Sequence, residues 1–74
     1  MEGLPIISGK ECVKALSKAG FYVRRQKGSH IIMRRDNPYA QVTVPNHKII
    51  DRGTLHSIIQ GAGMSVEEFN ALLK

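Results

Sequence analysis

The fold of the chain is decided by residues 21–44, which read FYVRRQKGSHIIMRRDNPYAQVTV. Apolar and polar residues alternate at the start of this stretch, and the composition of residues 26–29 predicts a tight connection in which Gly28 takes a positive φ. Residues 30–35 predict a second strand and residues 40–44 a third, separated by a turn signal. Because the connections are short, the three strands must pair antiparallel.

One face of this predicted sheet is apolar. In the second strand we expect Ile31 and Met33 to face the core, with His30, Ile32 and Arg34 on the other side. In the third strand the expected inward residues are Ala40, Val42 and Val44, and the outward residues are Gln41 and Thr43. One face of the sheet should therefore be covered by helices while the other meets solvent.

Helical patterns flank the three strands. Ser8 to Glu11 fit a capping box, after which Cys12, Leu16 and Ala19 repeat at helical spacing until Gly20. After the strands, Leu55, Ile58, Ile59 and Ala62 form an amphipathic pattern closed by Gly63, and a second capping box at Ser65 to Glu68 opens a short last helix. The order helix-strand-strand-strand-helix and short last helix predicts a two-layer α+β fold that resembles the double-stranded-RNA-binding domain.

The size and composition of the chain predict one globular domain spanning residues 1–74. Apolar runs are only a few residues long, whereas a membrane span needs roughly 20, so neither a membrane segment nor a signal peptide is expected. The single cysteine, Cys12, permits no internal disulfide and favours a reducing, cytoplasmic location. It fits the helical core stripe, and we expect it to be a structural thiol.

Positive charge is concentrated in residues 24–35. This segment holds Arg24, Arg25, Lys27, Arg34 and Arg35 and no acidic residue, while the whole chain has a net charge of +5. Such focusing suits a polyanion, although a solvated basic hairpin is an alternative. With two tyrosines, two phenylalanines and no tryptophan, we do not expect an extended base-stacking platform.

His30 is the most reactive candidate in the sequence. It follows Gly28 and Ser29 inside the basic segment, where a histidine can deprotonate an RNA 2′-hydroxyl and neighbouring cations can stabilise the phosphate. The alternative is an exposed strand histidine that only touches phosphate. His47 is an accessory candidate, either a partner acid or an ordinary loop residue. The remaining histidine, His56, is expected to be solvated, and no CxxC or HxxxH spacing points to a metal.

Several short motifs together resemble the HicA, or YcfA-like, family of toxins in type II toxin-antitoxin systems. They are Ser8-Gly9-Lys10-Glu11, Lys18-Ala19-Gly20-Phe21, Gly28-Ser29-His30, Val42-Thr43-Val44-Pro45 with His47, Gly53-Thr54-Leu55 with Ile58, Ala62-Gly63, and Ser65 through Phe69. The resemblance implies a toxin that cleaves mRNA, with His30 as its catalytic residue after Gly28 and Ser29. We expect no cofactor and a cytoplasmic location. It also implies a HicB-type antitoxin that covers the active site.

Three functional hypotheses follow. The first is a metal-independent endoribonuclease toxin whose basic hairpin binds RNA phosphates through Arg24, Arg25, Lys27, Gly28, Ser29, Arg34 and Arg35. The second is a non-catalytic RNA-binding module, which would bind with strong salt dependence and without turnover. The third is a protein-interaction module whose basic face docks an acidic partner. Cleavage of RNA in the presence of chelator would separate the first hypothesis from the others.

Overall fold

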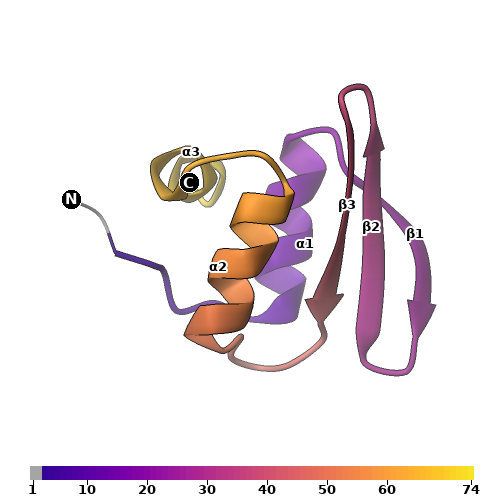
Figure 1. The fold of residues 1–74 in the computed structure, drawn as a ribbon. Coiled ribbons are helices and arrows are strands. Elements are labelled where there is room, and N and C mark those ends of the chain that lie inside the picture. Colours follow the sequence, from indigo (N-terminus) through magenta and orange to yellow (C-terminus); the bar gives the residue numbers. More distant parts are fainter. Residues whose placement is uncertain (1–2) are drawn as a thin grey trace.

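The computed structural model describes residues 3–74 and contains a three-stranded sheet and three helices, as the sequence predicts. The helices lie on one side of the sheet, and the other side is uncovered (Figure 1). In chain order the elements are α1 (Gly9–Lys18), β1 (Tyr22–Lys27), β2 (His30–Asp36), β3 (Tyr39–Pro45), α2 (Arg52–Gly61) and α3 (Val66–Leu72). The predicted two-layer α+β architecture is therefore confirmed, and it is consistent with the double-stranded-RNA-binding-domain fold.

The strands pair antiparallel in the order β1-β2-β3. Lys27 pairs with His30, so Gly28 and Ser29 alone form the turn of the first hairpin. Gly28 has φ +60°, and no residue other than glycine has a positive φ in the described part of the chain. A glycine with positive φ at the first central position is the geometry of a type II′ hairpin turn. The expected conformation of Gly28 is confirmed.

The core lies between the sheet and the helices. Ile31, Met33, Val42 and Val44 are buried, which confirms the predicted inward register of β2 and β3. They pack with a helical set that includes Cys12, Leu16, Leu55, Ile59 and Phe69. Even-numbered residues of β2, beginning with His30, consequently face away from the helices.

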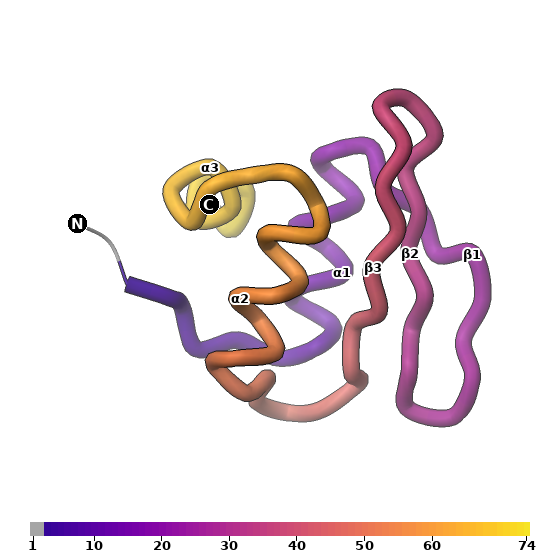
Figure 2. The backbone as a smooth tube through the Cα atoms, viewed as in Figure 1, coloured from indigo at the N-terminus to yellow at the C-terminus, as the bar shows by residue number. Residues whose placement is uncertain are grey.

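Strand β1 departs from the alternating pattern expected at its start. All six of its residues are exposed, and only Phe21, just before the strand, is buried. The reason is its position, because β1 is the strand furthest from the helices (Figure 2). A shift in the pairing register between Val23 and Arg25 also breaks the alternation of side chains along this continuous strand. The alternation of apolar and polar residues in β1 therefore indicates a strand, but it does not indicate that one face of this strand is buried.

The helix ends follow the predicted signals. Both capping boxes form, with Ser8 accepting from Glu11 N–H and Ser65 accepting from Glu68 N–H, each at 3.1 Å. Gly20 and Gly63 follow the ends of α1 and α2 with φ values of +94° and +76°. These are the left-handed conformations that commonly end helices.

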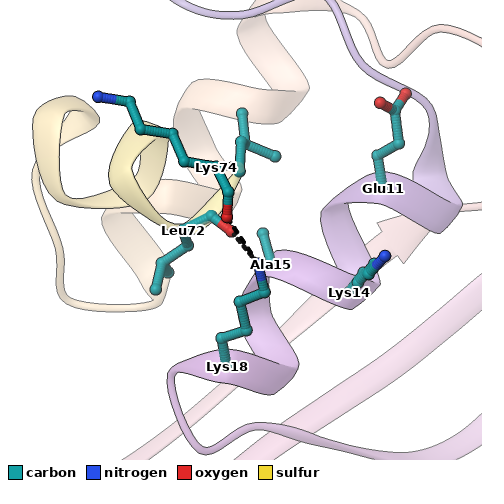
Figure 3. Close-up of a pocket in the computed structure, with 7 residues that line it drawn as sticks. Glu11, Lys14, Ala15, Lys18, Leu72 and Lys74 are labelled. Atoms are coloured by element: carbon teal, nitrogen blue, oxygen red, sulfur yellow. Dashed lines mark hydrogen bonds between the residues drawn. The ribbon is translucent and has the colours of Figure 1, made fainter.

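The last helix is attached to the first at the carboxyl end of the chain. The Lys18 ammonium donates to the carbonyl oxygens of Leu72 and Lys74, both at 3.0 Å (Figure 3). A cation at this position satisfies carbonyl groups that the end of a helix leaves without partners. Within residues 3–74, none of the helices is long and apolar enough to cross a membrane.

Candidate functional site

A cleft of about 330 Å³ lies where the β1–β2 turn approaches the loop between β3 and α2. Its lining comprises His30, Thr43, Pro45, His47, Asp51 and Thr54. The structure thus brings together two histidines that are separated by sixteen intervening residues in the sequence. A shallow, open depression shares Thr43 and Thr54 with this cleft and lies along β3 and α2.

His30 is held by the sheet. It is the first residue of β2, immediately after the two-residue turn, and it pairs with Lys27 on one side and Pro45 on the other. Because the neighbouring Ile31 is buried in the core, the side chain of His30 lies on the opposite, uncovered face. His30 is exposed, so a ligand can reach its imidazole.

His47 is held by backbone contacts of its loop. Its carbonyl oxygen accepts from Gly9 N–H at 2.8 Å, and the adjacent Asn46 N–H donates to the Ser29 carbonyl at 2.6 Å. Further along, Ile50 N–H donates to Ile7 C=O at 2.9 Å. The loop is therefore attached both to the turn that carries His30 and to the segment that opens α1.

Gly9 allows this close approach. A Cβ added to it would collide with the Pro45 carbonyl oxygen and lie 2.9 Å from the Cα of Asn46. Glycine is required wherever two backbones come this near. The Ser8-Gly9-Lys10-Glu11 motif thus serves the candidate site as well as the helix cap.

Asp51 closes the far side of the cleft. Its carboxylate accepts from the N–H groups of Gly53 at 3.1 Å and Thr54 at 3.3 Å, so it caps the amino end of α2. Neither this cap nor the presence of Thr43 and Thr54 in a cleft is predicted from the sequence; Thr43 is predicted only as an outward strand residue. The N-cap preference for aspartate ahead of Gly53-Thr54-Leu55 is the signal that would have identified the cap.

The basic segment is divided by the structure. Arg24, Arg25 and Lys27 are exposed on β1, and the pairing of Lys27 with His30 places this strand beside the cleft. Arg34 lies on the uncovered face, where its Nε is 2.8 Å from Asp36 Oδ1. This contact with Arg34, together with a hydrogen bond from Tyr22, lowers the pKa of the Asp36 carboxyl. Arg34 is thus partly neutralised. Within residues 3–74 no cation of β1 has an acidic partner within ion-pair distance, although the charge of Arg24 also acts on Asp36.

Arg35 turns toward the helices and away from the other cations. Its Nε donates to Pro38 C=O at 2.9 Å and its Nη2 to Ala62 C=O at 3.3 Å, and its guanidinium lies 4.8 Å from the centre of the Phe21 ring. The alternation that places Ile31 and Met33 inward also places Arg35 inward, so the signal was present in the sequence. We therefore omit Arg35 from the candidate RNA-binding surface.

The other chemically reactive side chains lie outside the cleft. His56 is exposed on α2 and does not line it. Cys12 is fully buried, and burial raises the pKa of its thiol to about 12. Among the residues that the structure describes, no group of three or more histidine, cysteine, aspartate or glutamate side chains is arranged to hold a metal ion.

The site combines an exposed histidine in a cleft with a neighbouring cationic strand, and both belong to a small sheet like that of the double-stranded-RNA-binding domain. These features are typical of compact basic proteins that bind polyanions. The family model described as HicA toxin of bacterial toxin-antitoxin matches residues 9–64, and the chain belongs to this family. A comparison with curated proteins found no match. Family membership indicates a toxin role within a toxin-antitoxin system, with an antitoxin as partner.

Proposed function

We propose that the chain is a metal-independent endoribonuclease toxin that cleaves mRNA with His30 as its catalytic residue. The observation that carries the proposal is the cleft that exposes His30, the histidine of the Gly28-Ser29-His30 motif, together with His47. Family membership supports the same conclusion, because HicA toxins are known for ribonuclease activity. The proposal places the protein in the cytoplasm, where mRNA is available.

In the proposed reaction the histidines of the cleft transfer protons to and from the RNA. The His30 imidazole accepts the proton of a 2′-hydroxyl, and the resulting oxygen attacks the adjacent phosphorus. The bond to the 5′-oxygen of the next nucleotide breaks, and that oxygen takes a proton, for which His47 is the candidate donor in the same cleft. The products are a 2′,3′-cyclic phosphate and a 5′-hydroxyl, so this step consumes no water, and the two histidines carry out both proton transfers.

The proposed RNA grip lies mainly on β1 and its turn. Arg24, Arg25 and Lys27 are exposed there, and Gly28 and Ser29 offer backbone close to His30. Arg34 is a secondary contact because Asp36 already compensates part of its charge. If the three β1 cations neutralise three phosphates of single-stranded RNA, the log–log salt slope of binding should be roughly −2.

The exposed cations of β1 also support a proposal about the antitoxin partner. We assign the antitoxin to the HicB type and place it over the cleft, where it would exclude RNA. A protein that docks there should present acidic groups, because charge complementarity speeds association and selects the partner.

Cleavage in excess chelator tests the catalytic proposal. Wild type, His30→Ala and His47→Ala are incubated with a long unstructured RNA, and His56→Ala serves as the matched control because His56 is exposed outside the cleft. We expect His30→Ala to lose about 10²–10⁴-fold in rate, as the loss of a general base does, while retaining RNA affinity. His56→Ala should cut normally. Equal cutting by His30→Ala, or binding without cutting by folded wild type, would overturn the proposal in favour of another residue or a binding module.

A further inference from the structure

A second group of side chains lies on the uncovered face of the sheet, at the end opposite the His30 cleft. Tyr22 pairs with Arg34 across β1 and β2, and Asp36 pairs with Tyr39 across β2 and β3. This end of the sheet is next to the β2–β3 turn, whereas His30 is next to the β1–β2 turn at the other end (Figure 1). Tyr39 is 66% exposed and Tyr22 43% exposed.

These side chains are held in place by one another. The Tyr22 hydroxyl donates to the Asp36 carboxylate at 3.1 Å, and Arg34 Nε donates to the same carboxylate at 2.8 Å. The Arg34 guanidinium also lies 5.8 Å from the centre of the Tyr39 ring. Arg34 therefore lies near two exposed aromatic side chains, Tyr22 and Tyr39, on the uncovered face of the sheet.

We propose that Tyr22, Arg34 and Tyr39 form a compact platform on which unpaired RNA bases stack. Aromatic rings and arginine guanidinium planes are the groups on which single-stranded bases stack in RNA-binding proteins. The cations of β1 belong to the same sheet and supply the attraction for phosphate that such a platform needs. The composition argued against an extended platform, and the structure gathers the two tyrosines into a small one.

The platform lies within reach of the cleft along one strand. Arg34 is four residues from His30 on β2, which corresponds to about 13 Å at the usual rise of a strand, and both side chains face the same side. One RNA strand can therefore stack bases on the platform while a 2′-hydroxyl a few nucleotides away meets His30. A duplex cannot do this because its bases are already stacked inside the helix. The inference rests on the proposed function and narrows the substrate to single-stranded RNA.

Tyrosine fluorescence provides a direct test. The chain has two tyrosines and no tryptophan, so its intrinsic emission reports only on the platform. The full chain is titrated with a single-stranded oligonucleotide whose 2′-hydroxyls are methylated, so that it binds without being cut. We expect binding to quench the emission, also in Tyr22→Phe, where Tyr39 is the sole remaining fluorophore.

Matched variants measure the contribution of stacking. Tyr39→Ala should weaken binding about tenfold, whereas Tyr39→Phe, which keeps the ring, should bind as wild type does. Ile6→Ala is the control, because Ile6 is also an exposed apolar side chain, at 80%, but lies outside the sheet. Circular dichroism confirms that each variant is folded.

Two outcomes would overturn the platform. The first is equal affinity for an abasic oligonucleotide with the same number of phosphates, which would mean that charge alone binds the RNA. The second is tighter binding to a duplex without quenching, which would mean recognition of helical shape. Because the methylated strand cannot be cut, quenching by a protein that fails to cleave ordinary RNA would refute the catalytic proposal and leave the platform supported.

Discussion

The backbone N–H of Gly9 donates to the carbonyl oxygen of His47 at 2.8 Å, across a gap that leaves no room for a side chain on Gly9. This contact connects the first turn of α1 to the loop that lines the cleft. The position of His47 therefore depends on the packing of a helix start that is distant in the sequence. Stability and site geometry should respond together when this contact is disturbed.

Gly9→Ala should both destabilise the fold and impair RNA cleavage. The new methyl group would collide with Pro45 and Asn46, and overpacking of this kind costs about 1–3 kcal/mol in the free energy of unfolding. Urea unfolding measures the first effect, and cleavage under conditions where the variant is folded measures the second. Gly3→Ala is the control, since among the residues that the structure describes no atom beyond the adjoining residues lies within 4 Å of a Cβ built there. Wild-type stability in Gly9→Ala would show that the loop can move away freely.

Much of the fold could be predicted because it depends on local signals. The capping boxes at Ser8 and Ser65 need only residues three positions apart, and they form as predicted. The register of β2 follows from the alternation of Ile31 and Met33, which the core confirms. Such patterns are short in range, so a single sequence contains them in full.

The arrangement of the site depends on contacts that no periodicity records. The approach of His47 to His30 requires an irregular loop attached at Gly9 and Ser29, and loops of this kind carry no repeating pattern. The exposure of β1 was also missed, because it results from how far the helices extend over the sheet. Local sequence predicts which residues form a strand, while the covering of that strand is a property of the whole fold.

Substitutions of Gly28, in the hairpin turn beside His30, should change stability only through the backbone conformation that this position requires. Gly28 has φ +60°, yet within residues 3–74 no atom beyond the two adjoining residues lies within 4 Å of a Cβ built on it. Gly28→Ala should therefore cost about 1–2 kcal/mol of unfolding free energy through the left-handed backbone and nothing through collision. Gly28→Asn should cost less, because asparagine tolerates this conformation better. Urea unfolding of the two variants is the measurement, and equal losses would point to a cause other than the sign of φ.

The Cys12 thiol should be unreactive in the folded protein. It is fully buried, and burial raises its pKa from an ordinary value of 9.0 to about 12, so the nucleophilic thiolate is nearly absent at neutral pH. A thiol reagent at pH 8 should react slowly with native protein and rapidly in urea. Fast labelling without denaturant would contradict the burial of this side chain.

The same shift predicts an alkaline loss of stability. Above pH 9 the unfolded chain releases the thiol proton while the native protein still holds it, so the free energy of unfolding falls as the pH rises toward about 12. Below pH 9 this contribution to the pH dependence is absent. Urea unfolding at pH 7 and pH 10 should show a larger decrease for wild type than for Cys12→Ala. An identical decrease in both proteins would assign the alkaline effect to other groups.

Substitution of two arginines of the basic segment should have opposite effects, one mainly on stability and the other mainly on RNA binding. Arg35 donates to Ala62 C=O and stacks on Phe21, so Arg35→Ala should lower the unfolding free energy by about 2 kcal/mol. Arg25 is exposed on β1, so Arg25→Ala should change stability by no more than about 0.5 kcal/mol. For RNA affinity we expect the reverse order, with the larger loss in Arg25→Ala, because the exposed Arg25 can contact phosphate whereas Arg35 is bound to backbone carbonyls.

Salt titrations make this contrast quantitative. Removing one phosphate contact to single-stranded RNA should reduce the magnitude of the log–log salt slope by about 0.7, and we expect this for Arg25→Ala. Arg35→Ala should keep the wild-type slope wherever it is folded, because its guanidinium faces the helices. A reduced slope in Arg35→Ala with an unchanged slope in Arg25→Ala would mean that RNA lies over the turn at Pro38, and the proposed surface on β1 would be wrong.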